Sequence, residues 1–325
     1  MSYIQNGTIE YGDVNKFATG SATGTTPNPT LVNINSLWGI GSGNIGYGQT
    51  TYPLLNVAQN NSVKAADWIP LTSVLTLLTR HQNLTNITPT NVASPALNGI
   101  ITYQDYATRL QSLWSNRLDT TAGAGITVIP TTHISNSWTG SLSPVFTVTF
   151  ASGDQARYFF NCGGRIRISF SQTGYSTTNI VAVGMAAVVS ATGLLYISSP
   201  NGTATASMPN STFTGFTQQT TGSVALRTVY DTATGYYGLT TSNKTLYNMY
   251  NSSTTLIYLR VSARTNGTQG VNGDNGNVIT ISPTWSTFGL GTTPITGIFA
   301  TTCALILPET INVANSWGTP TVTVV

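Results

Sequence analysis

The chain has 325 residues, and only 6% of them are Asp, Glu, Lys or Arg, against about a quarter in an average soluble domain. Disordered chains combine high charge with few aromatic residues, so 40% hydrophobic and 10% aromatic residues exclude disorder as the overall state. The net charge of +3 comes from dispersed basic residues, which excludes the clustered basic face that nucleic-acid binding requires.

The composition predicts a mainly β protein, because Thr, Val, Ile and Tyr favour strands while 32 glycines and 14 prolines favour turns. No apolar run approaches the roughly 20 residues of a membrane span, so we expect no membrane contact. The first residues, MSYIQNGTIEYGD, lack a basic segment followed by an apolar core. We therefore expect no secretory signal and synthesis in the cytoplasm.

Residues 1–62 are predicted to form an extended N-terminal arm rich in Gly, Asn and Thr. Their apolar residues gather in 11–17, 31–41 and 52–57, which are expected to be short strands or extended contacts. These are too few to form a core, so the arm should pack on its own domain or on a neighbouring subunit. The run GIGSGNIGYG at 39–48 lacks the Gly-Lys-Ser/Thr of a phosphate loop, so we expect no nucleotide and no cofactor.

Residues 63–122 are predicted to form a helical hairpin that attaches the chain or mediates oligomer contacts. Apolar residues at i, i+3, i+4 and i+7 predict a helix over 63–82, with Pro70 in its first turn. An apolar stripe of tyrosines, leucines and Trp114 predicts a second helix over 102–118. Helices this short need packing partners, which we expect to be each other and symmetry mates.

Residues 123–325 are predicted to form a β-sandwich-like body, after a Gly/Thr hinge at 120–132. No repeat with a period of roughly 20–50 residues indicates a propeller or solenoid. Small residues and valines at 178–192 permit a helix or a strand, and we favour a helix packed on the sheet. The end of the chain, 309–325, is expected to be an edge or tail strand. Further strands are predicted at 144–150, 156–160, 165–171, 194–199, 223–230, 255–264, 277–285 and 297–307.

The most distinctive stretch is 146–170, FTVTFASGDQARYFFNCGGRIRISF. Alternating apolar residues predict two strands, each with one apolar face, and a sharp turn between them. Glycine tolerates the backbone conformations of a tight reversal, and Gly164 is expected to have a positive φ. Alternation should make the last two arginines project from the face opposite the apolar residues. The predicted structural corner consists of Arg157, Tyr158, Phe159, Phe160, Asn161, Gly163, Gly164, Arg165 and Arg167.

The sequence contains no pattern typical of a catalytic, cofactor-binding or metal-binding site. His81 and His133 have no partner at metal-ligand spacing, so helix-cap or surface roles are expected. The nine acidic residues are isolated, whereas a glycoside hydrolase needs two paired carboxylates, which only folding could bring together here. Cys162 and Cys303 lie in apolar surroundings and are expected to be buried thiols, with a long-range disulfide as the alternative.

Two groups of side chains have both a structural and a functional interpretation. The charges around Asp154 are expected to include an ion pair with Arg157 or a neighbouring arginine that fixes the corner. The alternative is an anchor for a subunit contact or an acidic ligand. Five tyrosines can stack on sugars, although strand packing and interface contacts are the commoner roles. They are Tyr236, Tyr237, Tyr247, Tyr250 and Tyr258.

Trp138, the strand FTVTF and the segment ARYFFNCGGRIRISF follow one another in the middle of the chain. This order resembles a pattern in virion proteins of tailed bacteriophages, with an Arg-aromatic-Phe-Asn-x-Gly-Gly corner. Its later part is similar to the segments at 235–250, 257–265 and 277–285, so the resemblance covers about residues 60–290. It implies a structural, tail-fibre-like or tail-associated role, and it carries no catalytic residues.

These observations lead us to expect a non-enzymatic structural protein of the virion, assembled in the host cytoplasm, in the tail, baseplate or a fibre. Its expected partners are further copies of the chain, with a trimer as one candidate form, and other virion proteins. Two alternatives stay open: a receptor-binding protein that recognises host surface glycan, and a head decoration or head-fibre protein. A depolymerase is a further alternative with less support from the residues.

Overall fold

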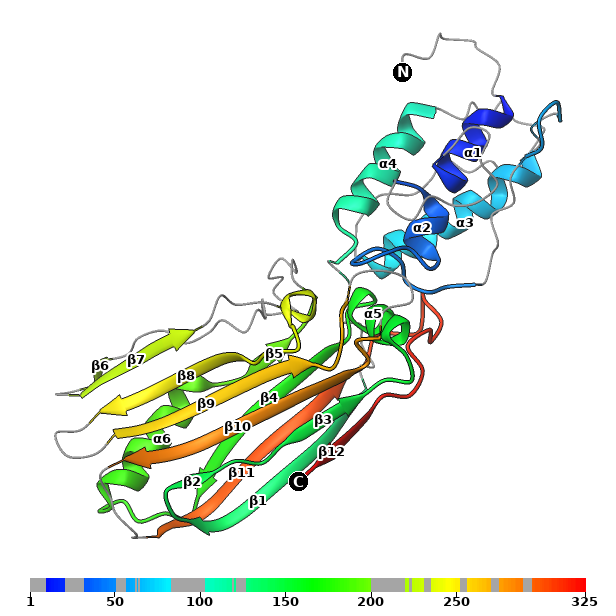
Figure 1. The fold of residues 1–325 in the computed structure, drawn as a ribbon. Helices are drawn as coiled ribbons and strands as arrows, with labels where there is room; N and C mark the ends of the chain where they lie inside the picture. Colours follow the sequence, from blue (N-terminus) through cyan, green and yellow to red (C-terminus); the bar gives the residue numbers. More distant parts are fainter. Residues whose placement is uncertain are drawn as a thin grey trace.

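In the computed structural model, two antiparallel β-sheets pack face to face and a group of helices sits at one end of them (Figure 1). The mainly β fold predicted from the composition is confirmed. The structure describes residues 10–20, 32–50, 57–61, 63, 65–82, 103–118, 120, 127–199, 220–221, 224–230, 235–251, 256–269, 275–288 and 294–325.

The smaller sheet has four strands in the order β1-β11-β4-β5. Alternate residues of its central strand β11, including Phe299, Cys303 and Leu305, are buried against the other sheet. The first strand was not predicted, because its Thr- and Pro-containing first half reads as a hinge. The strands are β1 (Val128–Trp138), β4 (Arg165–Thr173), β5 (Leu195–Ile197) and β11 (Ile295–Ile306).

The larger sheet has eight strands, in the order β12-β3-β10-β9-β8-β7-β6 with β2 also paired to β10. The predicted tail strand is confirmed as β12, which lies at one edge of this sheet beside β3. The strands are β2 (Ser141–Leu142), β3 (Phe146–Thr149), β6 (Thr220–Thr221), β7 (Val224–Tyr230), β8 (Lys244–Asn251), β9 (Leu256–Thr265), β10 (Val278–Phe288) and β12 (Thr321–Val324).

Helix α6 (Ile180–Thr192) confirms the prediction of a helix packed on the sheet. It contacts strands of both sheets, and its buried Met185 and Val188 join Trp285 and Phe299 in one apolar cluster. The Asn179 side chain caps the helix by accepting hydrogen bonds from the first backbone N–H groups. The valines here are therefore helical, because the cap and the apolar sides of both sheets outweigh their β propensity.

The N-terminal segments expected to be strands or extended contacts form helices instead. These are α1 (Tyr11–Thr19) and α2 (Ile34–Trp38), while 52–57 lies almost wholly outside the described residues. A capping box between Glu10 and Asp13 starts α1, and the Asn33 side chain accepts a hydrogen bond from Ser36 N at 2.7 Å to start α2. The caps determine that these short segments are helical, because strand and helix patterns of apolar residues are hard to tell apart over so few residues.

Both central helices are confirmed as α3 (Ala65–His81) and α4 (Tyr103–Ser115), but they do not form an antiparallel hairpin. Gln82 Nε2 and Arg117 O, just beyond the two C-terminal ends, both bond to Tyr47 Oη, so these two ends lie together. Helix α3 begins at Ala65, so Pro70 lies beyond its first turn. No helix within the described ranges is both long and apolar enough to cross a membrane.

The predicted strand at 156–160 and the sharp turn around it are wrong, because helix α5 (Gly153–Asn161) occupies this stretch. It connects β3 in the larger sheet to β4 in the smaller one, so the two predicted strands are real but belong to different sheets. Ser152 accepts a hydrogen bond from Gln155 N at 3.1 Å. This Ser-x-x-Gln signature marks a helix start, and the strong β propensity of Arg-Tyr-Phe-Phe concealed it.

The two glycines after α5 have different roles from those expected. Gly163, not Gly164, has the positive φ, at 93°, which suits the left-handed end of a helix. A Cβ on Gly164 would lie 2.6 Å from Phe159 O and 2.7 Å from the Phe159 ring. Gly164 is therefore required by the close approach of helix and strand rather than by its own backbone conformation.

Candidate functional site

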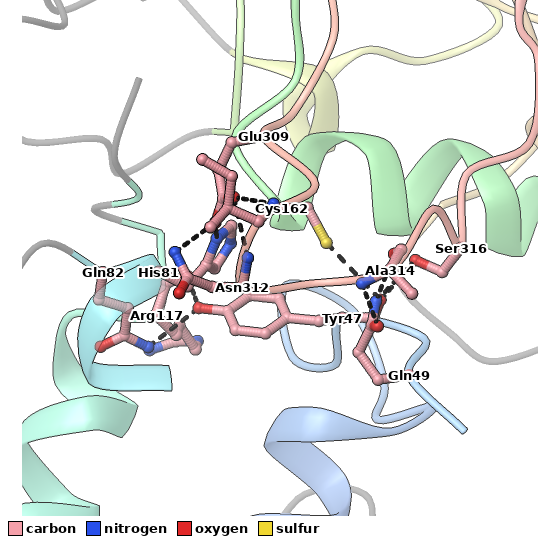
Figure 2. A network of polar contacts seen from close by, with 11 residues as sticks. Tyr47, Gln49, His81, Gln82, Arg117, Cys162, Glu309, Asn312, Ala314 and Ser316 are labelled. Atoms are coloured by element: carbon pink, nitrogen blue, oxygen red, sulfur yellow. Dashed lines mark hydrogen bonds and ion pairs between the residues drawn. The ribbon is translucent and has the colours of Figure 1, made fainter. Parts of the chain in front are cut away.

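The described residues concentrate their buried polar contacts where the helices meet the two sheets. We call this region the junction; it comprises residues 39–49, the C-terminal ends of α3 and α4, helix α5 and residues 307–318. Figure 2 shows Tyr47 in its middle, with side chains from several of these segments converging on it. The segments lie far apart in the sequence, so each bond closes a long loop of chain.

A buried ion pair joins the end of α3 to the segment that follows β11. His81 Nδ1 lies 2.7 Å from Glu309 Oε1, and both side chains are almost fully buried. Glu309 also accepts hydrogen bonds from Ile311 N at 2.6 Å and from both nitrogens of Asn312. The expectation that His81 has a helix-cap or surface role is therefore wrong, because its side chain is buried and paired with Glu309.

The donors around Glu309 decide its ionisation. Burial alone raises the pKa of the Glu309 carboxyl group. The hydrogen bond and charge of His81 and the two Asn312 donors lower this pKa by more than burial raises it, and the result is a pKa of about 2. The carboxylate is thus ionised at neutral pH. An ionised, buried carboxylate with at least four contacts is a structural anchor rather than a proton donor.

Tyr47 connects both helix ends to the glycine-rich residues. Its hydroxyl donates to Arg117 O at 2.6 Å and accepts from Gln82 Nε2 at 2.9 Å. Its ring meets the His81 ring edge-on at a centroid distance of 5.0 Å. Burial raises the pKa of the Tyr47 hydroxyl, so it stays protonated and keeps its donor role. The Arg117 guanidinium in turn donates to Asn44 O at 3.0 Å and Asn44 Oδ1 at 2.9 Å.

The side-chain amide of Gln49 bonds to both backbone groups of Ala314, as a neighbouring strand would, and so joins residues 39–49 to residues 307–318. Its Oε1 accepts from Ala314 N at 2.7 Å and its Nε2 donates to Ala314 O at 2.9 Å. Ser316 Oγ and Cys162 Sγ both donate to Tyr47 O, at 2.5 Å and 3.6 Å. One backbone carbonyl therefore collects donors from two other parts of the chain.

Helix α5 holds the glycine-rich residues from the side of the sandwich through Arg157. This side chain is fully buried and donates to Ile40 O at 2.8 Å and to Gly43 O at 3.1 Å. It also pairs with Asp154 at 3.2 Å, which confirms the expected ion pair. The expected geometric role is therefore only part of what Arg157 does, because its two carbonyl partners lie more than a hundred residues away.

Asn161 and Tyr237 complete this contact. Asn161 Nδ2 donates to Gly46 O at 2.9 Å and approaches Gly43 O at 3.2 Å. Tyr237 Oη lies 2.7 Å from Gly43 O and 2.8 Å from Asn161 Oδ1, and its single proton serves one of them. Burial raises the pKa of Tyr237, so this proton is retained at neutral pH.

The orientation of residues 39–49 shows what this run can bind. Phosphate loops direct backbone N–H groups at an anion. Here the carbonyl oxygens of Ile40, Gly43, Asn44, Gly46 and Tyr47 face the side-chain donors of the junction instead. The bonds are internal to the protein, and the run acts as a set of acceptors for its own chain.

The remaining residues of the predicted corner are packing groups around the junction. The guanidinium carbon of Arg157 lies 5.4 Å from the centroid of the Tyr158 ring, and this ring fills the space beside Gly48. Phe159 and Phe160 are buried in the core, where Phe160 stacks on Tyr236 at a centroid distance of 4.2 Å. Burial raises the pKa of the Tyr158 hydroxyl.

The two arginines of β4 alternate with buried Ile166 and Ile168, as predicted. Arg165 is nevertheless buried, and this burial lowers its pKa. Arg167 is half-buried, and its Nε makes no hydrogen bond within the described part of the chain. Neither arginine takes part in the junction, so the predicted corner divides into residues that hold the junction and residues of the smaller sheet.

The cysteines and His133 form no reactive or metal-binding site within the described residues. Cys162 and Cys303 are both free and buried, as expected, and burial raises the pKa of each thiol, that of Cys303 to about 12. His133 lies half-buried on β1. Within the described residues, no three His, Cys, Asp or Glu side chains gather in a metal-binding arrangement.

Sequence reasoning missed Tyr47, Gln49, Gln82, Arg117 and Glu309 as parts of one site. A single Gln or Tyr carries no local signal of a long-range partner. The glycine-rich run was the one available clue, because five glycines within residues 39–48 indicate that another part of the chain approaches the backbone closely.

Comparison of the chain with protein-family models, with curated proteins and with solved structures finds no match in any of the three. The residues and geometry of the junction and of the sheets are therefore the basis for a functional hypothesis.

Proposed function

We propose that the chain is a non-enzymatic structural component of a bacteriophage virion, in the tail, baseplate or a fibre, which assembles through contacts between subunits. The observation that carries the proposal is the junction. Buried polar groups from both termini and the middle of the chain bond to one another there. Such a joint fixes the helices relative to the sheets, as a component that must hold its shape within an assembly requires.

The chemistry of the junction supports a structural role. His81 is fully buried with its Nδ1 on Glu309, which leaves it remote from any substrate in solution. The Cys162 thiol is buried and its pKa is raised, so it is a poor nucleophile at neutral pH. Each of these groups has an internal partner that accounts for its position.

The resemblance to tailed-phage virion proteins gains a physical meaning in this fold. Arg157 and Asn161 of the Arg-aromatic-Phe-Asn-x-Gly-Gly segment hold the glycine-rich run, and the Phe residues enter the core. Gly164, the last residue of this segment, lacks a side chain and so allows Phe159 to pack directly against the backbone. Every one of these positions has a folding role, which suits a structural family without catalytic residues.

The glycan-binding alternative receives less support from the described tyrosines. Tyr236 is buried and stacked on Phe160, and the Tyr237 hydroxyl belongs to the junction. Tyr258 is half-buried, and the side chains of Tyr247 and Tyr250 lie outside the described part. Three of the five candidates are therefore unable to present a whole ring face to a sugar.

The test is the location of the protein in particles of the phage that encodes it. Mass spectrometry of extensively washed particles, with immunogold labelling, should find the chain as a stoichiometric component at the tail. Labelling on the capsid would favour a head decoration or head-fibre protein. Abundance in lysed cells with absence from washed particles would contradict a virion role.

Two assays on purified protein test for glycan binding and for depolymerase activity. Binding to host cells or to a glycan array would support the receptor-binding candidate. New reducing ends released from host polysaccharide would support a depolymerase and contradict the non-enzymatic proposal.

A further inference from the structure

Strand β1 is the longest strand at an edge of the smaller sheet. It spans Val128–Trp138 and, within the described residues, pairs with β11 on one side only. The opposite edge is β5, which has three residues, and the neighbouring edge β12 of the larger sheet has four. A long free edge presents unpaired backbone groups that can bind another strand.

The hydrogen-bonding groups of this free edge follow from the register. Leu307 N donates to Thr127 O at 3.0 Å, and residues of an antiparallel strand alternate between bonding inward and outward. The even-numbered residues Val128, Pro130, Thr132 and Ile134 therefore direct their backbone groups away from β11. Proline has no N–H to lose at such a position, so Pro130 fits this assignment, and three N–H groups and four carbonyls remain available.

Three large apolar side chains of this otherwise largely polar strand are exposed, and one lies on its neighbour. Ile134 is 61% exposed, Ile129 41% and Val128 40%, and Ile298 on the adjacent β11 is 47% exposed. Val128 and Ile134 lie on the outer face of the strand, whereas Thr131, His133 and Ser135 on the inner face are half-buried. Edge strands of monomeric proteins are guarded by charged side chains, by proline or by bulges, and β1 has Pro130 and a bulge between Ser135 and Ser137 but no charged residue. The sequences of β1 and β11 contain no Asp, Glu, Lys or Arg.

We propose that β1 pairs, antiparallel and edge to edge, with β1 of a second copy of this chain, so that two four-stranded sheets become one continuous sheet. A twofold contact sets each residue near its own counterpart, which is unfavourable wherever that residue is charged. The absence of charge along β1 therefore favours a second copy over a charged partner. Thr132 lies near the centre of the free edge, and Thr–Thr cross-strand pairs are favourable.

The bulge between Ser135 and Ser137 limits the pairing to the first part of the strand. Residues 128–134 remain as the contact, with Pro130 as the one position that cannot donate. The inference rests on the proposed function only in requiring that copies of the chain meet each other during assembly.

The test uses charge at position 132 of the full chain. The Thr132 side chain is exposed, and among the described residues its hydroxyl bonds to that of the half-buried Thr302 at 2.9 Å, so Thr132→Lys and Thr132→Asp should fold. Light scattering on the wild type should give twice the 34.3 kDa of a single chain. Each variant alone should show a twofold lower mass because like charges meet across the axis. An equimolar mixture of the two variants should restore the doubled mass.

Ser171→Lys is the matched control, because Ser171 is exposed on the same face of the smaller sheet but on β4, which β11 separates from β1. It should leave the doubled mass unchanged. Circular dichroism must match the wild type for every variant, and Ile134→Lys with Ile134→Asp replaces the first pair if it does not.

A monomeric wild type, an unchanged mass for both charged variants, or a mixture that fails to reassociate would overturn the pairing. Loss of the dimer in Ser171→Lys as well would show that the sheet face, rather than its edge, binds the second copy. None of these results bears on whether the chain is found in washed particles. Failure of the β1 contact is thus distinguishable from failure of the proposed virion role.

Discussion

Arg157→Met should destabilise the fold by about 2–4 kcal/mol, although methionine preserves most of the length of the buried side chain. Ile40 O loses the guanidinium donor at 2.8 Å, and an unsatisfied buried carbonyl costs about 1–3 kcal/mol. Gly43 O keeps Asn161 and Tyr237 as neighbours, so its loss is smaller. Removal of a buried charge offsets part of the cost, because the guanidinium no longer has to leave water on folding.

Two control variants separate the contributions at this site. Arg264→Met makes the same chemical change at an exposed position of β9 and should alter the stability by no more than about 0.5 kcal/mol. Asp154→Asn removes the partner of the ion pair, whose carboxylate is 27% exposed, and should cost at most about 1 kcal/mol.

The measurement is urea unfolding followed by tryptophan fluorescence, with hydrogen exchange of residues 39–49 as a local readout. The amides of this run should lose protection in Arg157→Met before those of the sheets do. The reasoning would be refuted if Arg157→Met cost no more than Arg264→Met. It would also fail if Asp154→Asn reproduced the whole effect, since the carbonyl contacts would then contribute nothing.

Three further predictions concern the ionisation of Glu309, the contact at Gly48 and the two buried thiols. With a folded pKa of about 2 for Glu309, stabilisation is complete above the ordinary carboxyl pKa of about 4.3 and is lost as the pH falls towards 2. Urea midpoints at pH 6 and pH 3 should therefore differ less in Glu309→Gln than in the wild type. Gly48→Ala places a Cβ 2.5 Å from the Tyr158 ring at a φ of +68° and should lower the melting temperature more than Gly140→Ala. Gly140 has a φ of +70°, and a Cβ there would meet no other atom. Equal losses of melting temperature in the two variants would mean that the Tyr158 ring moves aside without destabilising the fold. Cys162 and Cys303 should react with a thiol reagent only after unfolding, and rapid labelling of the native protein would contradict their burial.

Local sequence patterns predicted those elements whose stabilising contacts repeat along the segment. The four apolar positions of α3 are all buried, as their helical spacing required. The strands at 165–171, 255–264 and 277–285 also follow from their alternation. Helix α5 was missed because its aromatic run favours a strand, whereas its cap at Ser152 and its place between two sheets favour a helix.

The junction was beyond the reach of such patterns. His81 and Glu309 are separated by 228 residues, and Gln49 and Ala314 by 265. No spacing rule connects positions so far apart, since the contact depends on how the helices and sheets are assembled. The glycine-rich run showed that something must approach the backbone closely, but the identities of Arg157 and Asn161 as its partners required the fold.

The distribution of the few charges links the junction to the free edge. Arg117, Arg157, Glu309 and Asp154 are all used at the junction, whereas β1 and β11 have none. The first end of β1 adjoins the junction, because Thr127 O accepts from Leu307 N just before Glu309. Antiparallel pairing of two β1 strands would therefore set the helices of the two copies at opposite ends of one continuous sheet (Figure 1). A stiff junction at each end would then fix both groups of helices relative to each other, and the result would be an elongated unit with equivalent ends for further contacts.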